Sequence, residues 1–351
     1  MGSRPGVSIC VPVYNGAPFV AETLVAALNQ TYEPLTVLVS DDGSGDESLA
    51  ICRSFTADSR VLVWRQPARL GWVANCNWLL ARAESELVCI VSHDDLAEPE
   101  MISRLVRALS EVPDAALAFC DVATFGRWRR RRVWRREAID GTPAERVGRF
   151  MATHFDGTAF HALIRRTAVD TAGGLRGNEI ADFAADVSWL GRLAAVGSFV
   201  RVPESLYRKR RHYASASQRW GDWDDERRAD AWALHCRELL HDALELSLAP
   251  DEQEALVRAA IRRVLAIEPV RPFGYIRDLP LARQAALVAS LLATLPESAR
   301  AVIPAHGADD PQAIGEAYWS VPPESLRRAR QLARRLSTRA MRPLRRLRSH
   351  I

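Results

Sequence analysis

The first hundred residues alternate short apolar runs with segments of helical periodicity, and this alternation constrains the fold more than any other feature. Apolar runs predict buried strands at Val7–Val11, Leu35–Val39, Val61–Trp64 and Glu86–Val91. Apolar residues recur at helical spacing over Phe19–Asn29, Asp46–Phe55, Trp72–Ala83 and Pro99–Leu109. Strands and helices that alternate in this way predict an α/β fold, with a mostly parallel sheet flanked by helices.

Two pairs of aspartates follow predicted strands directly. Asp41-Asp42 comes after the second strand, and Asp94-Asp95 comes after the fourth. Ligands of parallel α/β sheets bind at the carboxyl ends of the strands, so both pairs lie where a ligand is expected. Acidic turns without a function are common, but two double-aspartate turns on one edge of one sheet are much less common by chance.

Three motifs in this order resemble the inverting family 2 glycosyltransferases over about residues 7–215. They are Val11-Pro12-Val13-Tyr14-Asn15-Gly16, Asp41-Asp42-Gly43-Ser44 and Asp94-Asp95. Each motif alone is weak, whereas the set is specific. The resemblance implies a GT-A fold (Rossmann-like) and transfer of a sugar from a nucleoside diphosphate to an acceptor hydroxyl.

The resemblance also implies a set of donor contacts. Tyr14 would pack on the nucleobase, with Pro12 and Asn15 in the same pocket, and Asp42 would accept a hydrogen bond from the base or ribose. A tyrosine of the ordinary hydrophobic core is the alternative for Tyr14.

Further donor contacts are expected from two other segments. Leu70–Trp78 resembles the helix start that approaches the donor, so Asn75 or Asn77 would face it; helix capping is the alternative. Tyr207–His212 resembles the loop that closes over the diphosphate, with Arg208 and His212 as its contacts, because cations and histidine suit a diphosphate. A solvated basic loop is the alternative there.

The second acidic pair resembles the family's metal motif. Asp95 is expected to bind Mg²⁺ or Mn²⁺, since a hard anionic diphosphate pairs naturally with such an ion, and Asp94 is expected nearer the ribose or a metal-bound water. Many relatives have a further aspartate where this chain has Ser92, which puts the ligand set in doubt. His93 is expected to line the pocket rather than to bind the ion.

A segment that resembles the family's acceptor side begins with Gly157-Thr158-Ala159-Phe160 and continues through residues 183–193. The family's Glu-Asp pair is Ala185-Asp186 here, so the resemblance makes Asp186 the catalytic base. Inversion needs one base, which takes the acceptor proton as the new bond forms. Capping of the following helix is the alternative role of Asp186.

Three parts are expected along the chain: a GT-A domain at 1–220 (nucleotide half about 7–125, acceptor half about 126–220), a helical domain at 221–310 and a basic tail at 311–351. Ser325–Ile351 has ten arginines and no acid, and its apolar residues share one helical face. This pattern is typical of helices on anionic membrane surfaces, with a disordered tail as the alternative. Arg127–Arg136 holds seven arginines and suits an anionic acceptor, a lipid headgroup, nucleic acid or plain solvation.

Composition excludes several other classes. Six scattered cysteines without a Cys-x-x-Cys pair argue against a zinc site and a disulfide framework. No signal peptide is recognised, and the longest apolar stretch, Ala285–Leu295, is far below the ~20 residues of a membrane span. We therefore expect a cytoplasmic protein, at most peripheral on the inner face of the membrane. Gln218-Arg219-Trp220 lacks the spacing of the processive synthases' Gln-x-x-Arg-Trp motif.

The sequence thus predicts an inverting, metal-assisted, non-processive glycosyltransferase of cell-surface glycan or polysaccharide biosynthesis. Its donor would be a UDP- or dTDP-sugar and its acceptor a glycan or lipid-linked molecule. An inactive GT-A domain that binds a nucleotide or acts as a scaffold is the alternative, because Ser92, Cys76 and Ala185 depart from the family pattern. Only the arginine clusters suggest nucleic acid, which is the weakest interpretation.

Overall fold

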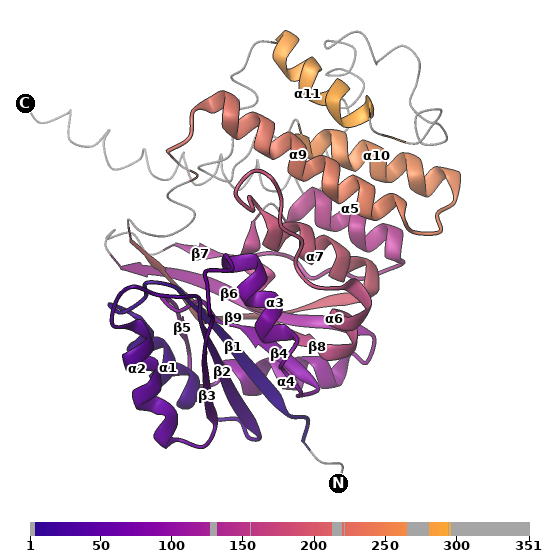
Figure 1. The fold of residues 1–351 in the computed structure, drawn as a ribbon. Helices are drawn as coiled ribbons and strands as arrows, with labels where there is room; N and C mark the ends of the chain where they lie inside the picture. Colours follow the sequence, from indigo (N-terminus) through magenta and orange to yellow (C-terminus); the bar gives the residue numbers. More distant parts are fainter. Residues whose placement is uncertain are drawn as a thin grey trace, which may run out of the picture. The chain divides into compact units, whose positions relative to one another are not determined.

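A nine-stranded sheet forms the centre of the described part of the chain, in the order β3-β2-β1-β4-β8-β6-β9-β5, with β7 paired to β6 (Figure 1). The computed structural model describes residues 4–126, 132–154, 156–212, 220, 222–264, 281–293 and 295. All of these belong to one unit, residues 1–302. The predicted basic tail and Arg127–Arg131 of the arginine cluster lie outside the described residues.

The N-terminal half of the sheet agrees with the prediction. Its four parallel strands are β1 (Val7–Val13), β2 (Leu35–Asp41), β3 (Val61–Arg65) and β4 (Leu87–Ile90). Each lies within two residues of a predicted strand. Continuous apolar runs form β1, β2 and β4 because helices cover both faces of the sheet there, whereas the edge strand β3 is only partly buried.

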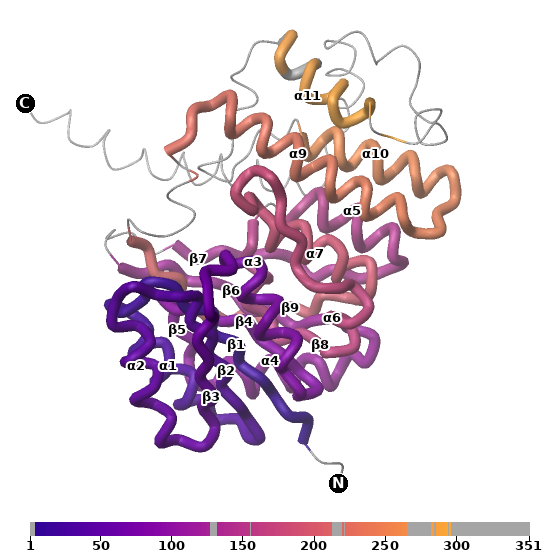
Figure 2. Tube along the Cα trace, in the orientation of Figure 1, coloured from indigo at the N-terminus to yellow at the C-terminus, as the bar shows by residue number. Residues whose placement is uncertain are grey.

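The other half was not predicted strand by strand. It contains β5 (Leu96–Ala97), β6 (Ala115–Gly126), β7 (Val133–Trp134), β8 (Leu163–Arg165) and β9 (Ser198–Arg211). The short β8 is antiparallel to β4 and β6, and the two long strands β6 and β9 are parallel to each other. Figure 2 shows the indigo N-terminal strands and the magenta later strands side by side in this sheet.

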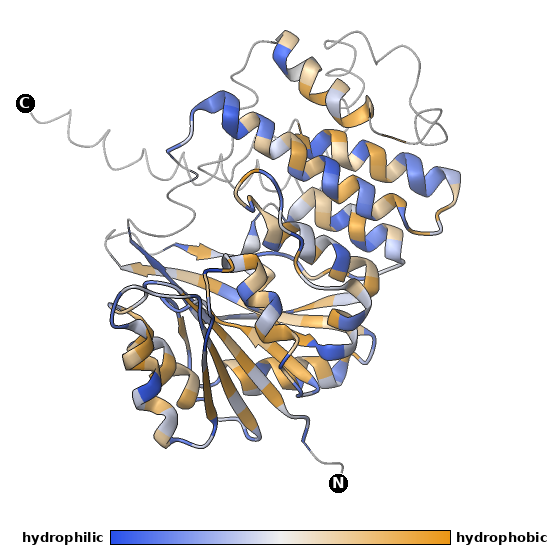
Figure 3. Ribbon diagram, in the orientation of Figure 1, coloured by the Kyte–Doolittle hydropathy of each residue, from blue (hydrophilic) through white to orange (hydrophobic). Residues whose placement is uncertain are grey.

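Helices cover the first half of the sheet on both faces. α1 (Val20–Leu28), α2 (Ser48–Ser54, continued by the 3₁₀ turn η1, Phe55–Ala57) and α4 (Met101–Glu111) share one apolar core with the odd-numbered residues of β1. α3 (Trp72–Leu80) packs on β1 and β2 from the other face. All four helices were predicted, with ends shifted by up to three residues. Figure 3 shows the strands between these helices mainly in orange, as expected of a buried sheet.

The acceptor half and the segment after it are mainly helical. They comprise α5 (Pro143–Thr153), the 3₁₀ turn η2 (Gly157–His161), α6 (Arg166–Ala172), α7 (Ala185–Val196), α9 (Asp225–Leu244), α10 (Pro250–Val264) and α11 (Leu281–Ala293). α9 packs on α7, and α10 packs on α5 and α9. The predicted helical segment is therefore present, while its division from the sheet domain at residue 220 stays a prediction. In the described residues, no helix is long and apolar enough to cross a membrane.

Candidate donor and acceptor site

The turn after β1 carries the residues predicted to hold the nucleobase. Tyr14 is half-buried rather than part of the core, and Arg69 lies over it with its guanidinium carbon 4.1 Å from the ring centroid. Pro12 is half-buried beside it. A planar base could stack on the tyrosine face that the guanidinium now covers, because both groups stack on aromatic surfaces. Tyr14 and Pro12 therefore remain candidate base contacts, and Arg69 joins them.

Asn15 differs from the expectation, because its polar groups bond to the neighbouring loop. Its side-chain Oδ1 accepts the backbone N–H of Gly45 at 2.9 Å, and its own backbone N–H donates to Ser44 Oγ at 2.9 Å. Asn15 also has a φ of 47°, a left-handed conformation that asparagine tolerates better than most residues. These contacts give Asn15 the role of fixing the turn that presents Tyr14.

Asp42 is likewise bonded to backbone rather than open to a ligand. It is 2% exposed, and its two carboxylate oxygens accept the N–H groups of Leu70 at 2.6 Å and Gly71 at 3.0 Å. The direct contact with base or ribose that the resemblance implied is therefore replaced by an indirect role. Asp42 holds the loop from which Arg69 reaches Tyr14.

The side-chain amides of Asn75 and Asn77 are also bonded within the protein. Asn75 is buried, accepting from Ser40 Oγ at 2.6 Å and donating to the Ser40 carbonyl at 3.0 Å. Asn77 exchanges two hydrogen bonds of 2.8 Å with the backbone of Leu175. Both amides tie α3 to its neighbours, to β2 in one case and to the acceptor half in the other. Neither amide caps α3, because its N-cap is Gly71 and no side chain bonds there, so helix capping, the alternative, does not describe these contacts either.

In the loop after β4 the side chains of the adjacent Asp94 and Asp95 point in different directions, and that of Asp95 points into the protein. It is 1% exposed, accepting from Tyr207 Oη at 2.9 Å and from the backbone N–H of Arg210 at 2.7 Å. Burial, together with the adjacent Asp94, raises the pKa of Asp95 to about 7. A fully enclosed carboxyl whose two oxygens both accept internal hydrogen bonds does not fit the expected role of metal ligand.

Asp94 is the more accessible acid and has a histidine partner. Its Oδ2 lies 2.7 Å from Nε2 of His212, and the two side chains are 15% and 18% exposed. Burial alone would raise the pKa of Asp94, but His93 and the hydrogen bond from His212 hold it below its ordinary value. The sequence had placed His212 near the diphosphate, and the structure brings it to Asp94. His93 contacts the Pro12 carbonyl through Nδ1 at 3.3 Å, in agreement with a pocket-lining role.

Side chains of β9 alternate between the two faces of the sheet, so neighbouring basic residues of this strand lie on opposite faces. Arg208 points away from the aspartates, 4.7 Å from the ring centroid of Phe125 and 3.7 Å from the carboxylate of Glu98. It is therefore not positioned as the diphosphate contact that the sequence suggested. Tyr207 and Lys209 lie on the opposite face, and the Tyr207 hydroxyl reaches Asp95 there. Neither was predicted as a site residue from the sequence.

Asp186 stands in the first turn of α7, next to the η2 turn. A Cβ added at Gly157 would lie 2.1 Å from Asp186 Oδ2, so the carboxylate fills the space that the glycine leaves open. Burial raises the pKa of Asp186, while the charge of Lys209 and the backbone N–H of Val187 oppose this effect. A half-buried carboxylate near a cation and beside a glycine is compatible with the role of base, and that role stays a prediction.

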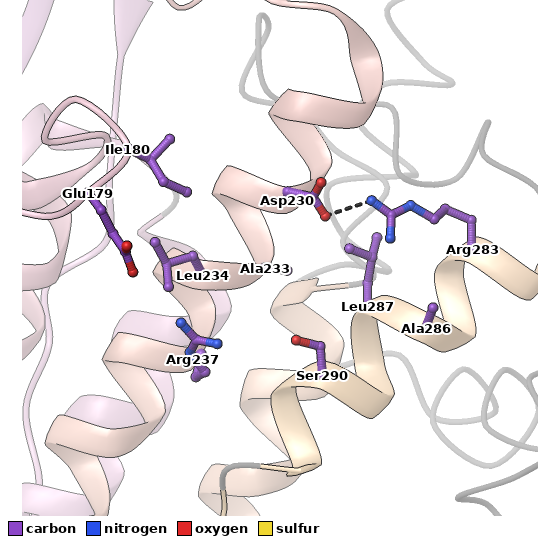
Figure 4. Close-up of a pocket in the computed structure, with 10 residues that line it drawn as sticks. All are labelled: Glu179, Ile180, Asp230, Ala233, Leu234, Arg237, Arg283, Ala286, Leu287 and Ser290. Carbon is purple, nitrogen blue, oxygen red and sulfur yellow. Dashed lines mark hydrogen bonds and ion pairs between the residues drawn. The ribbon is translucent and has the colours of Figure 1, made fainter.

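The cavity drawn in Figure 4 belongs to a different region. It measures about 410 Å³ and lies between the 179–180 loop, α9 and α11. Its lining includes Glu179 and Arg237, and an ion pair of 2.6 Å between Arg283 and Asp230 crosses one side. None of the predicted site residues lines it, so this cavity is separate from the candidate donor and acceptor site.

Comparison with known proteins agrees with this geometry. The family described as glycosyl transferase family 2 matches residues 8–173. "Glycosyltransferase GlyG" of Streptococcus pneumoniae is 34% identical over 106 residues, covering 30% of this chain and 35% of that protein. "Putative glycosyltransferase EpsH" of Bacillus subtilis is 30% identical over 121 residues, covering 34% of each. The chain thus spans about a third of the length of these curated relatives.

Solved structures show the same fold. TarS of S. aureus (residues 1–349, in complex with UDP-GlcNAc) has a TM-score of 0.63 at 16% identity and covers 85% of this chain and 84% of that one. The mannosyltransferase PcManGT from Pyrobaculum calidifontis, in complex with GDP-Man and Mn2+, has a TM-score of 0.52 at 22% identity and covers 91% and 83%.

A mostly parallel sheet with acidic loops at its carboxyl edge and these structural neighbours define a GT-A fold. The family match covers residues 8–173, a little under half of the chain, and assigns this part to a family 2 glycosyltransferase domain. The predicted fold and family are both confirmed.

Proposed function

We propose that this protein transfers a sugar from a nucleoside diphosphate to an acceptor hydroxyl with inversion, using a divalent cation. The observation that carries the proposal is the Asp94–His212 pair, 2.7 Å apart and partly exposed, at the carboxyl edge of a family 2 sheet. A carboxylate oxygen and an imidazole nitrogen that meet at one partly open point suit a metal ion.

The two candidate ligand atoms favour Mn²⁺ over Mg²⁺ as the ion, and the exposure of the two aspartates favours Asp94 over Asp95 as its ligand. Mg²⁺ takes oxygen ligands almost exclusively, whereas transition metals accept imidazole nitrogen as well. Among the described residues, no group of three or more His, Cys, Asp or Glu side chains could hold a metal. Two ligands from the protein would leave coordination positions for diphosphate oxygens and water. The bound ion would neutralise charge on the departing diphosphate.

Asp186 is proposed as the single base. The acceptor hydroxyl would give its proton to the Asp186 carboxylate as its oxygen bonds to the anomeric carbon of the donor. The bond from that carbon to the phosphate oxygen breaks, and its electron pair leaves with the nucleoside diphosphate. A direct displacement of this kind inverts the anomeric carbon and needs no nucleophile from the protein, so one carboxylate suffices.

The nucleotide would stack between Tyr14 and Arg69, with Asp42 holding the loop that carries the arginine. The donor class proposed is a UDP- or dTDP-sugar, supported by the structural neighbour that was solved with UDP-GlcNAc. The acceptor proposed is a glycan or lipid-linked molecule of cell-surface polysaccharide biosynthesis, modified one sugar at a time. We also propose that the protein is cytoplasmic and that its basic tail, outside the described residues, contacts anionic membrane.

Thermal shift with UDP, dTDP, GDP and CDP, each with and without Mn²⁺, tests the donor site. One diphosphate should stabilise the protein only with the metal, and Asp94→Ala and His212→Ala should each remove this metal dependence. Asp140→Asn, an exposed acid paired with Arg149, is the matched control. A metal-dependent shift that survives Asp94→Ala would contradict the ligand assignment, and no shift with any nucleotide would contradict a functional donor site.

Asp186→Asn tests the base separately. It should bind nucleotide and Mn²⁺ like the wild type, while the rate of transfer falls on the order of 10²- to 10⁴-fold, the usual contribution of a positioned base. Nucleotide and metal binding with no transfer to any acceptor, in the wild type as well, would favour the alternative of a nucleotide-binding scaffold. Asp186→Asn protein that retained wild-type kcat would overturn the base assignment.

A further inference from the structure

Three adjacent strands, β7, β6 and β9, place a set of cations on the face of the sheet that carries the site. Val122 of β6 is in register with Trp134 of β7 and with Tyr207 of β9. Residues in register point to the same face, and so do residues two apart on one strand. Since the Tyr207 hydroxyl bonds to Asp95, this face is the one that looks onto the acidic loop.

One step further along the strands lie two cations. Thr124 is in register with Lys209, and it exchanges hydrogen bonds with the backbone of Arg132. Lys209 and Arg132 therefore flank Thr124 on the site face, next to Trp134. Lys209 Nζ lies 5.7 Å from the ring centroid of Trp134, which confirms that these two side chains share a face.

The cations of the opposite face are neutralised by acids. Arg208 contacts Glu98 at 3.7 Å, and Arg210 contacts Glu22 at 2.7 Å. Asp121, on the same face as Phe125, accepts from Arg201 and lies 3.3 Å from Arg135. These ion pairs leave little positive charge for an external ligand on that side.

The site face differs in this respect. Within the described residues, neither Lys209 nor Arg132 forms an ion pair, and Arg132 is exposed. Lys209 nevertheless lies near enough to Asp94, Asp95 and Asp186 to lower the pKa of each carboxyl against the effect of burial. The ammonium group of Lys209 is thus near three carboxylates but bonded to none of them. It is available to bind an anion that enters the site.

Residue choice points the same way. Lys209 is the only lysine among the 47 basic residues of the chain. An arginine at this position would hold one neighbouring carboxylate in a rigid two-point pair, whereas an ammonium group can turn its three donors toward a bound ligand.

We propose that the acceptor is anionic: the hydroxyl that receives the sugar belongs to a molecule whose phosphate or carboxylate group binds to Lys209 and Arg132 beside Trp134. This proposal rests on the glycosyltransferase function proposed above and adds the chemical class of its acceptor. Trp134 would contact the uncharged part of the acceptor, while Asp186 receives the proton from its hydroxyl. Lys209, Arg132 and Trp134 all lie in the predicted acceptor half, whereas β6, which pairs with both β7 and β9, belongs almost wholly to the predicted nucleotide half.

Two pairs of small probes separate charge from shape. Calorimetric titration of protein loaded with nucleotide and Mn²⁺ compares glycerol 3-phosphate with glycerol, and glucuronate with glucose. At least one anionic probe should bind roughly tenfold or more tightly than its neutral partner, as a charge-assisted hydrogen bond provides, and the difference should shrink with added salt. The pair that shows the larger difference distinguishes a phosphate from a carboxylate. Equal binding within both pairs, or no binding of any probe, would overturn the proposal.

Variants locate the anion. Lys209→Met and Arg132→Met should each lose roughly tenfold in affinity for the anionic probe and leave the neutral probe unchanged. Arg208→Met, the neighbouring cation on the opposite face of β9, is the matched control and should change neither. If Lys209→Met instead weakens the binding of nucleotide with Mn²⁺, the lysine binds the donor diphosphate and the acceptor assignment is wrong. If the wild type does not bind nucleotide at all, the proposed function itself fails, one step earlier.

Discussion

Gly157→Ala tests the position of Asp186 without touching the carboxylate itself. The added methyl carbon would lie 2.1 Å from Asp186 Oδ2, whereas ordinary contacts of such a carbon begin at 3.4 Å. The carboxylate must therefore move by about 1.3 Å, and a misplacement of about 1 Å in an active site costs on the order of 100-fold in rate. We expect kcat to fall by about this factor.

Stability should change far less than rate. The group displaced is the far end of a side chain, and a shifted rotamer costs about 0.5 to 1.5 kcal/mol. Gly148→Ala in α5 is the matched control, since its methyl group would meet only Leu256, at an ordinary 3.6 Å. It should leave kcat unchanged and stabilise the helix by about 0.5 to 1 kcal/mol.

Steady-state rates at saturating donor and thermal unfolding of both variants supply the comparison. Near wild-type kcat in Gly157→Ala would refute the placement of Asp186 as the base. A large loss of stability that matched the loss of rate would show instead that the glycine serves the fold alone.

Two further predictions concern buried polar groups. Burial lowers the pKa of His154 to about 3, from an ordinary 6.5. Below pH 6.5 the histidine is therefore protonated in the unfolded chain but stays neutral in the folded protein, and wild-type stability falls as the pH drops. His154→Phe should remove about 2 kcal/mol of this loss between pH 7.5 and pH 5, measured by urea unfolding, and an unchanged pH dependence would contradict a neutral His154. In the described residues, Trp72 Nε1 is buried without a hydrogen-bond partner, so Trp72→Phe should leave thermal stability equal or higher. Trp78→Phe on the same helix is the control. A clear loss of stability in Trp72→Phe would show that the indole N–H has a partner in the folded protein.

The sequence predicted the first half of the sheet well and the second half poorly, for a physical reason. Apolar runs mark β1, β2 and β4 because helices bury them on both faces, and the edge strand β3 is apolar although only Val61 of it is buried. β9 instead contains Pro203, Glu204 and a run of cations, and its strand conformation depends on pairing with β6. Pairing between distant segments leaves no local pattern in a single chain.

The site was predicted in the right loops, but two of its assignments moved by one residue. The structure favours Asp94 where Asp95 was expected as the metal ligand. On β9 it places Lys209 rather than Arg208 on the face of the site, where we propose a contact with the acceptor instead of the expected contact with the diphosphate. Arg208 and Lys209 are neighbours on a strand and point to opposite faces of the sheet, whereas Asp94 and Asp95 lie in and directly after a turn. In both places a shift of one residue changes which side chain faces the site. The spacing of sequence motifs therefore predicts which loop forms the site, but it does not predict which of two neighbouring side chains points into it.

The helices after residue 222 contribute to the site although they carry none of its proposed catalytic groups. Arg263 of α10 is 1% exposed, donating to the Met151 carbonyl of α5 at 2.9 Å and lying 3.1 Å from His235 Nε2. His235 in turn lies 3.0 Å from Ser188 Oγ, two residues after Asp186 on α7.

This chain of buried contacts makes α7 depend on α9 and α10 for its position. Arg263→Met would leave buried polar groups without a partner and should cost about 2 to 3 kcal/mol of stability. Because Asp186 is carried by α7, kcat should fall together with stability as the temperature rises, earlier than in the wild type. Arg262→Met, an exposed neighbour on α10, is the matched control and should alter neither. If Arg263→Met lowered the unfolding temperature but kept wild-type kcat up to that temperature, the helical segment would support the fold without positioning the base.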